Sequence, residues 1–276
     1  MSSRKKQCLL HANCQGEPLA ELLSLSAEFG RNWEIRHYIN YTKEAVPASA
    51  LENCDFFIYQ FLDEKWADLA SASLLEQLNP KADAFCMPSM FFKGCWPFWT
   101  IHSPIDFGDS MLNKLIDAGA GKPEILKIYL QGDISRFVDL QANLENTLQA
   151  EEEKETVCSL RTTPLVRELW REEMLFYTCN HPGKRLLAFL ADAILKRLGY
   201  AELPEKTVQA YEPEYADFEL PVHPQLAEFF NLRYAGRGYE FRIFNRRMDF
   251  ARYISRYVEC RLQGLDKEFL AFLQLV

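Results

Sequence analysis

The stretch CLLHANCQGEPLAELL, residues 8–23, joins a short apolar run to a helical pattern across a polar turn. Its leucines recur at the spacing of one helix face, and its proline suits a first helical turn. Residues 7–13 are therefore predicted to form a strand. Cys14 lies at the joint between this strand and a helix that is predicted to run as far as Gly30.

The alternation of strand and helix continues along the chain. Apolar or alternating runs predict further strands at residues 33–39, 54–60 and 82–88, and a helical pattern predicts a helix at residues 65–78. A strand–helix–strand rhythm of this kind predicts an α/β fold with a mostly parallel sheet and helices on both of its faces.

The middle of the chain is predicted to be mainly helical after an ordered, aromatic loop. A helix begins after Asp109, a natural N-cap, and ends at Gly119. Residues 124–178 follow as mostly helical. Within them the acidic run EEEKE, residues 151–155, is interpreted as a solvated face or loop.

The C-terminal part begins with a helix that opens at Pro182 and closes at Gly199. The tail from residue 222 is predicted to be mainly helical. We expect an α/β domain over residues 1–205 and a helical extension over residues 206–276 that packs on it, or a single domain that contains both.

The composition predicts a folded protein of the cytoplasm. Hydrophobic residues make up 48% of the 276 residues, which is enough for a packed core. No apolar run approaches the ~20 residues that span a bilayer, and the start MSSRKKQCLLHANCQGE is too polar for a signal peptide. The eight cysteines are then expected to stay reduced, most of them as small buried side chains.

The charge is acidic overall but basic near the end. A net charge of −8 argues against nucleic acid as a partner. Residues 231–261 nevertheless hold eight arginines and three carboxylates, a local charge of +5. Two interpretations stay open, namely solvated helix faces and a site for a phosphorylated ligand, since arginine offers forked donors to phosphate.

Cys14 and His181 are the residues with the clearest chemical potential. Ligands of open α/β sheets bind beyond the carboxyl ends of the strands, where Cys14 is predicted to lie. The helix amides that follow it, including that of Gln15, favour a thiolate and could hold an oxyanion. His181 precedes another helix and could act as the base of a nucleophile–base pair. The alternative is that both are ordinary packing or capping residues.

Two other patterns compete with this pair. His11 and Cys14, together with Cys179 and His181, could supply four zinc ligands, but neither spacing is a common zinc pattern. Gly108-Asp109-Ser110 imitates a serine-esterase signature, yet no apolar strand precedes it and Asp109 is explained as a helix cap. We expect no metal.

Four short motifs occur in a fixed order along the chain: Asn-Cys-Gln at 13–15, Tyr59-Gln60, Phe92-Lys93-Gly94-x-Trp96-Pro97, and Asn180-His181-Pro182. As a set they resemble the WcbI family of capsular-polysaccharide biosynthesis proteins over roughly residues 7–235. The resemblance implies an SGNH-hydrolase-like, three-layer α/β/α sandwich. It also implies an acetyltransferase that binds coenzyme A and acetylates a sugar of a capsular or surface polysaccharide.

The resemblance assigns roles to individual residues. Cys14 stands where SGNH hydrolases keep a nucleophilic serine, Asn13 where they keep an aspartate, and His181 at the late histidine. The aspartate that precedes that histidine is replaced by Thr178, so the third triad member is missing or comes from elsewhere. Gln60 is interpreted as an oxyanion-hole or substrate-orienting group.

Two mechanisms remain open from the sequence. In the first, Cys14 takes the acetyl group as a thioester and passes it to a sugar hydroxyl. In the second, His181 deprotonates the hydroxyl directly, and Cys14 and Gln15 line the oxyanion site. Acetyl-CoA is the expected co-substrate, and candidates for its binding are Asn13, Lys93, Lys184, Arg185 and Arg237.

Three classes of function follow from these hypotheses. The first is the acetyltransferase, with a carbohydrate or sugar nucleotide as acceptor. The second is an esterase or thioesterase on the same scaffold, in which water is the acceptor. The third is a non-catalytic module that binds coenzyme A or a sugar nucleotide.

Overall fold

The computed structural model describes residues 4–275 and divides into two compact units. Each unit is assembled from separate stretches of the chain. Unit 1 consists of Met1–Phe91, Ala150–Arg167 and His181–Glu214, and unit 2 of Phe92–Gln149, Glu168–Asn180 and Tyr215–Val276.

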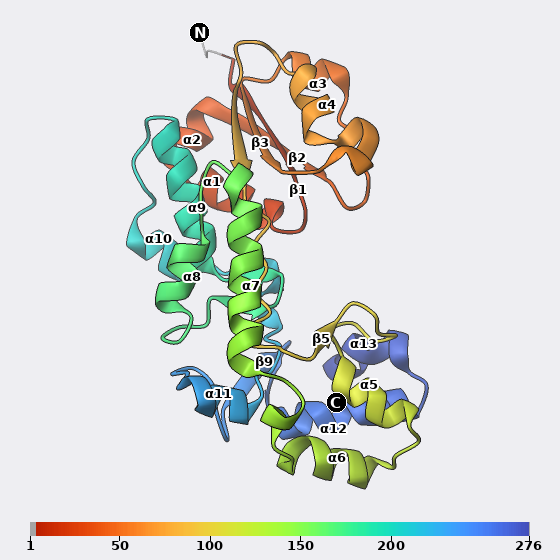
Figure 1. The fold of residues 1–276 in the computed structure, drawn as a ribbon. Coiled ribbons are helices and arrows are strands. Elements are labelled where there is room, and N and C mark those ends of the chain that lie inside the picture. Colours follow the sequence, from red (N-terminus) through yellow and green to blue (C-terminus); the bar gives the residue numbers. More distant parts are fainter. Residues whose placement is uncertain (1–3, 276) are drawn as a thin grey trace. The chain divides into compact units, whose positions relative to one another are not determined.

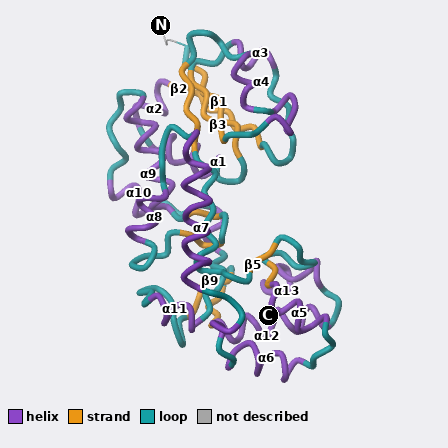
Figure 2. Tube along the Cα trace, viewed as in Figure 1, coloured by secondary structure: helices purple, strands orange, loops and turns teal. Residues whose placement is uncertain are grey.

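Unit 1 is organised around a parallel four-stranded sheet in the order β2-β1-β3-β4 (Figures 1 and 2). The strands are β1 (Lys6–Ala12), β2 (Trp33–Ile39), β3 (Phe56–Gln60) and β4 (Asp83–Met87). All four strands predicted from the sequence are confirmed to within two residues at each end. The fully buried run Phe56–Ile58 reflects the cover that this sheet has on both faces.

Helices cover the two faces of the sheet, as Figure 1 shows. On one side lie α1 (Gly16–Leu25), α2 (Ala27–Asn32) and α9 (Lys184–Arg197), and on the other lie α3 (Ala48–Glu52) and α4 (Ser71–Glu76). A continuous buried cluster lies between the sheet and helices α3 and α4. It includes Leu9, Leu51, Phe57 and Leu74. The predicted three-layer α/β/α architecture is therefore confirmed.

Helices α1 and α9 pack against each other and run in the same direction. Where they begin, segment 209–211 contacts both: the Tyr211 hydroxyl donates to the Pro18 carbonyl (3.2 Å) and the Lys184 ammonium donates to the Gln209 carbonyl (2.8 Å). Beyond their other ends, the Tyr200 hydroxyl accepts a hydrogen bond from the Trp33 indole (3.0 Å). Both helices therefore begin at the edge of the sheet where the strands end.

The first predicted helix is interrupted at Ser26, which the sequence interpretation missed. Ser26 has an extended backbone (φ −72°, ψ 117°), and its hydroxyl accepts from the Phe29 amide. Serine is a favoured N-cap, so it ends α1 and starts α2 four residues before Gly30. The predicted helix 65–78 is likewise divided, into a 3₁₀ helix (Glu64–Leu69) and α4.

The interpretation of residues 151–155 as solvated is wrong for two of the glutamates. This run is the last turn of α7 (Leu140–Lys154) and the residue after it, and Glu151 and Glu155 are buried. The Glu155 carboxylate accepts from the amides and hydroxyls of Thr162 and Thr163. Buried carboxylates require such donors, and nothing in a charge pattern reveals a partner seven residues away.

Unit 2 is mainly helical, as predicted for the end of the chain, but it also contains a hairpin. The hairpin consists of β9 (Glu240–Ile243) and β10 (Arg246–Asp249), which pair antiparallel. Its buried side chains are Phe241, Ile243 and Met248. Asp109 caps α5 (Ser110–Asp117), and Gly119 follows it with φ +81°, both as predicted.

The remaining elements complete the chain. The other helices are α6 (Lys122–Gln131), α8 (Thr163–Leu169), α10 (Glu205–Ala210), α11 (Pro224–Phe230), α12 (Phe250–Leu262) and α13 (Phe269–Leu275). Short strands are β5 (Trp99–Thr100), β6 (Gly108–Asp109), β7 (Phe176–Thr178) and β8 (His181–Pro182), and further 3₁₀ turns are Ile134–Arg136, Glu155–Val157, Glu214–Asp217 and Asp266–Glu268. Among residues 4–275, no helix combines the length and the apolar character that a membrane crossing requires.

Candidate functional site

A network of buried amides lies at the carboxyl edge of the sheet in unit 1. Asn13 follows β1, Gln60 ends β3, and Met90 lies three residues beyond β4. Parallel strands bring these positions to one edge, which is where open α/β sheets bind ligands. Cys14 sits directly on this network.

Gln60 is the centre of the network and is only 2% exposed. Its carbonyl accepts from the Asn13 amide (2.8 Å) and from the Asn40 side chain (3.3 Å). Its amide nitrogen donates to the side-chain oxygens of Asn13 (3.2 Å) and Gln15 (3.3 Å). All four hydrogen-bonding positions of this side chain are therefore used inside the protein. These contacts connect Gln60 to the turn that carries Cys14, and its oxyanion-hole or substrate-orienting role stays a prediction.

Hydrogen bonds inside the protein also fix the Gln15 side chain. Its side chain is fully buried, donates to the Met90 carbonyl (2.7 Å) and accepts from the Met90 amide (3.0 Å). Its backbone amide, expected from the sequence to face an oxyanion, donates to the Asn13 side-chain oxygen (3.0 Å). Asn13 and Gln15 thus shape the turn that presents Cys14.

Cys14 is half-buried in this turn. Burial raises the pKa of its thiol above the ordinary value, although the backbone N–H of Cys14 itself donates to the sulfur and opposes the shift. The sequence led us to expect a lowered thiol pKa at a helix start. That expectation is wrong, because loss of hydration outweighs the nearby amides. The resting group at Cys14 is a neutral thiol.

His181 lies three residues before the first residue of α9, which begins at the same edge of the sheet as α1. Burial lowers the pKa of its imidazole to about 4. The ring is therefore neutral at physiological pH and can accept a proton, as the sequence predicted.

Gly16 is required by the close approach of the turn to His37. A Cβ atom on Gly16 would lie 2.3 Å from His37 Nε2. The ring cannot easily move, because Nε2 donates to the Ala12 carbonyl (3.2 Å) and Nδ1 contacts the Glu17 carboxylate (3.3 Å). The sequence interpretation did not single out His37, whose only signal is its place on a predicted strand.

We expect Gly16→Ala to lower the free energy of unfolding by about 1–3 kcal/mol, the usual cost of overpacking. Urea denaturation measures this. Adding His37→Ala should recover a large part of the loss. Gly121→Ala is the matched control, because its nearest neighbour would be an ordinary 3.9 Å away. Equal losses in the two single variants would contradict the explanation.

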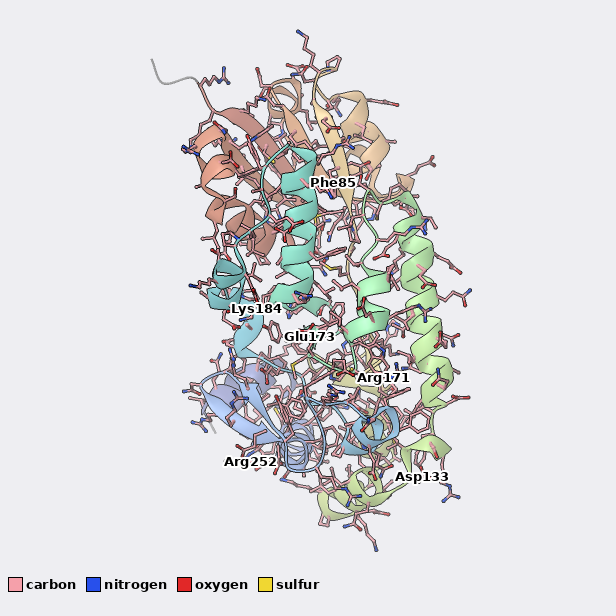
Figure 3. All side chains as sticks on the ribbon, turned by 90° about the vertical axis from the view of Figure 1, so that its left-hand side faces the viewer. Phe85, Asp133, Arg171, Glu173, Lys184 and Arg252 are labelled. Atoms are coloured by element: carbon pink, nitrogen blue, oxygen red, sulfur yellow. The ribbon has the colours of Figure 1, made fainter. Side chains whose placement is uncertain are left out.

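Lys184 and Arg185 are consecutive residues at the start of α9, and their surroundings differ. The Lys184 ammonium, at the start of α9 (Figure 3), already pairs with the Glu212 carboxylate at 2.8 Å. Arg185 is exposed and lines an open groove of about 730 Å³ beside α9, together with Lys196. This volume falls within the range of small-molecule sites.

The other proposed cofactor contacts, Lys93 and Arg237, belong to unit 2. Arg237 is exposed in the turn before β9. Of the remaining late arginines, five pair with carboxylates: Arg233, Arg242, Arg247, Arg256 and Arg261. The structure therefore supports a mainly structural explanation of the basic segment.

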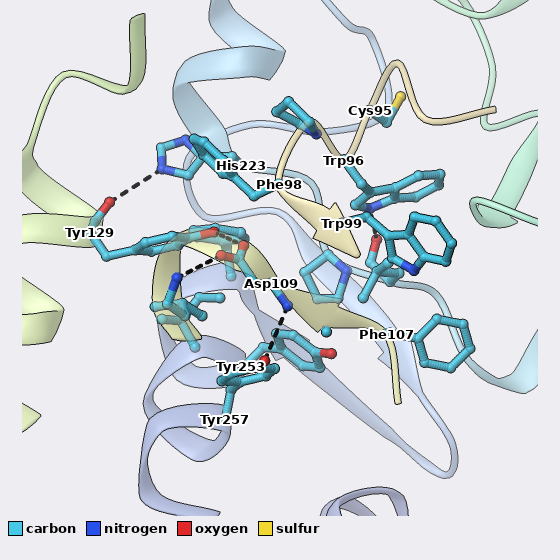
Figure 4. A pocket seen from close by; sticks show the side chains of 17 residues that line it. Cys95, Trp96, Phe98, Trp99, Phe107, Asp109, Tyr129, His223, Tyr253 and Tyr257 are labelled. Atoms are coloured by element: carbon cyan, nitrogen blue, oxygen red, sulfur yellow. Dashed lines mark hydrogen bonds between the residues drawn. The ribbon is translucent and has the colours of Figure 1, made fainter. Parts of the chain in front are cut away.

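The aromatic loop of unit 2 is mostly core. Trp96 and Phe98 are each 8% exposed, and the Trp96 indole donates to the Leu220 carbonyl (3.0 Å). Both line a cavity of about 40 Å³ whose floor holds Asp109 (Figure 4). Burial raises the pKa of Asp109 to about 6, and its carboxylate accepts from the Tyr129 hydroxyl. A space of this size holds a few waters and no sugar ring or adenine.

The hypothetical zinc ligands are not gathered into a site. His11 is 1% exposed in the middle of the sheet, and burial lowers its pKa to about 4. Cys179 belongs to unit 2 and the other three residues to unit 1. Within residues 4–275, the structure contains no group of three or more His, Cys, Asp or Glu side chains that could hold a metal ion.

Asn40 is a network residue that the sequence interpretation missed. It follows β2, and its side chain donates to Gln60 while its backbone amide donates to the Ala12 carbonyl (3.0 Å). Asn13 was singled out as a polar residue at the end of a predicted strand. Asn40 has the same position at the end of the predicted strand 33–39, so the same criterion would have identified it.

The fold places the chain in a structural class, the α/β proteins with a parallel sheet. Ligands of such proteins commonly bind at the carboxyl ends of the strands, which is where Cys14 lies. The chain belongs to the WcbI family, whose description is polysaccharide biosynthesis enzyme WcbI, with residues 7–203 matching the family model. This confirms the resemblance inferred from the four motifs.

A solved structure supports the fold over nearly the whole chain. It is described as native WcbI, a polysaccharide biosynthesis enzyme, without a disulfide bond between coenzyme A and its Cys14. The TM-score is 0.78 at 18% identity, covering 98% of this chain and 94% of that one. No curated protein matches the sequence significantly.

Proposed function

We propose that this protein is a cytoplasmic, coenzyme A-dependent O-acetyltransferase that acts on a sugar in capsular or surface polysaccharide biosynthesis. Family membership supports the polysaccharide context, and the similar structure associated with coenzyme A supports the co-substrate. The observation that carries the proposal is the half-buried Cys14 thiol on a rigid amide network, at the edge where the helix after His181 also begins.

The mechanism we propose is direct transfer. Neutral His181 accepts the proton of a sugar hydroxyl as its oxygen attacks the carbonyl carbon of acetyl-CoA. A C–O bond forms, the C–S bond breaks, and the departing coenzyme A thiolate takes the proton back from the imidazolium. Cys14 lines the position of the developing oxyanion.

Direct transfer is favoured over a Cys14 thioester for a physical reason. A covalent route first requires a thiolate, and burial raises the pKa of the Cys14 thiol, which opposes this ionisation. The lowered pKa of His181 weakens the base in both routes alike. In addition, acetyl-CoA is already a thioester, so moving the acetyl group to another thiol gains no activation.

For coenzyme A binding we propose Arg185 as the first contact for a phosphate group. It is exposed and lines the groove beside α9. Lys93, Arg237 and Asn13 remain further proposals for this role.

Calorimetric titration with coenzyme A, followed by acetyl transfer from acetyl-CoA to candidate sugars, tests the function. We expect binding in the micromolar range and transfer that depends on a sugar. No binding at millimolar coenzyme A would contradict the proposal. Steady acetate release without a sugar would indicate an esterase, and binding without any turnover would indicate a non-catalytic module.

The pH dependence of kcat/KM tests the assigned base. Because burial lowers the His181 pKa to about 4, the neutral ring persists well below neutrality. We therefore expect kcat/KM to stay within about twofold between pH 5 and pH 7. An unperturbed histidine base would lose about 20-fold over this range. Circular dichroism at each pH checks that the protein remains folded.

A further inference from the structure

A pair of thiols lies at the free side of β4, the edge strand of the sheet in unit 1. Cys86 is in the middle of this strand, and Cys158 follows the 3₁₀ turn after α7. Ser159 holds the two stretches together, because its amide donates to the Cys86 carbonyl (2.7 Å) and its hydroxyl accepts from the Cys86 amide (3.0 Å). The cysteines are therefore neighbours although 72 positions separate them in sequence.

The two sulfurs lie within reach of each other. Cys86 Sγ and Cys158 Sγ are 3.9 Å apart, in hydrogen-bond contact. Cys158 is half-buried and Cys86 is buried. A disulfide needs about 2.05 Å, so the sulfurs must approach by roughly 2 Å. Rotation of the Cys158 side chain, on an irregular surface segment, can supply much of this movement.

The surroundings of Cys86 also favour the charged form of its thiol. Hydrogen bonds from Cys158, the Tyr59 hydroxyl and the Phe61 backbone lower its thiol pKa. Burial raises the pKa of the cysteines at positions 8, 14, 54, 95, 179 and 260. Since the thiolate is the reactive form, the lowered pKa supports Cys86 as the attacking sulfur of the pair.

We propose that Cys86 and Cys158 form a redox-reactive dithiol that a peroxide converts into an intramolecular disulfide. The Cys86 thiolate attacks one oxygen of hydrogen peroxide, so an S–O bond forms, the O–O bond breaks, and the leaving hydroxide is protonated to water. The Cys158 sulfur then attacks Cys86, an S–S bond forms, and the S–O bond breaks. Its hydroxide leaves with the Cys158 proton as a second water.

The disulfide would link residues 150–167 covalently to the sheet of unit 1. Residues 150–167 come back to unit 1 after the chain has passed through unit 2, and Cys158 is where they meet the sheet. Closing a loop of about 70 residues restricts the unfolded chain and stabilises the folded one. The bond would also involve the sulfur that contacts the Tyr59 hydroxyl, next to Gln60 in the chain.

Peptide mapping after peroxide treatment tests this site independently of any acetyl transfer. The full chain with Cys14→Ala, which removes another half-exposed thiol, is treated with one equivalent of hydrogen peroxide and then alkylated. We expect a peptide pair linked through Cys86 and Cys158, which dithiothreitol separates. The melting temperature should rise by about 5–10 °C on oxidation.

Single variants make the test decisive. With Cys158→Ser added, we expect no linked pair, no rise in melting temperature, and a sulfenic acid at Cys86 that dimedone traps. With Cys54→Ser added instead, the linked pair should persist. The proposal is overturned if other cysteines oxidise while the 86–158 pair stays unlinked, or if the Cys158→Ser variant shows the same rise.

Discussion

Replacing His181 with glutamine should lower the rate of acetyl transfer by about 10²–10⁴-fold, the usual contribution of a general base. Glutamine is close to histidine in size but cannot accept the proton. Coenzyme A should still bind within about threefold of its wild-type affinity, because the proposed contacts of the coenzyme lie elsewhere. Steady-state kinetics and calorimetry on the same preparations measure the two effects.

Two further variants test whether the effect is specific to His181 and whether Cys14 carries the acetyl group. His102→Gln, at an exposed position, is the matched control and should leave the rate unchanged. Cys14→Ala distinguishes the two mechanisms, since direct transfer predicts a loss of no more than about tenfold whereas a thioester route predicts a loss as large as that of His181→Gln. Undiminished activity of His181→Gln would remove the base from the mechanism.

Replacing Gln60 with methionine should have the largest effect on stability at the site. The side chains are similar in length, but methionine leaves the Asn13 amide and the side chains of Asn40 and Gln15 without the partners that Gln60 provides. Unsatisfied buried groups of this kind cost about 1–3 kcal/mol each, although water can reach Asn13. We expect a total loss of about 2–4 kcal/mol in urea denaturation.

The same variant should impair activity, because the turn that carries Cys14 loses its support. The exposed Gln141→Met on α7 is the control, and its stability should stay within about 0.5 kcal/mol of wild type. A Gln60→Met protein with unchanged stability would show that the network does not hold the turn.

The layers of unit 1 could be predicted because they depend on local patterns. Four apolar runs indicated four strands, and Pro182 and Gly199 bracketed α9. The failures have identifiable causes. The cap at Ser26 was missed because this residue lies on a continuous helical face. Glu155 was interpreted as solvated because its partners, two threonines, follow a turn, and the charges in the sequence do not show that this turn brings them to the carboxylate.

The strand ends that carry the proposed site residues could be predicted, whereas the hydrogen bonds between those residues could not. Strand ends pointed to Asn13, Cys14 and Gln60, but the hydrogen bonds that occupy Gln60 join three different strands. Such partners depend on the sheet order β2-β1-β3-β4, which no single stretch of sequence encodes. The thiol pKa of Cys14 was misjudged because the cost of burial depends on the same tertiary packing.

A crystal structure with coenzyme A bound would test the proposed site. We expect the sulfur of the coenzyme to lie against Cys14 at the carboxyl edge of the sheet, in a space that the His181 imidazole also faces, with Gln60 buried beneath. Coenzyme A bound away from this edge, or Cys14 and His181 facing different spaces, would contradict the proposed function.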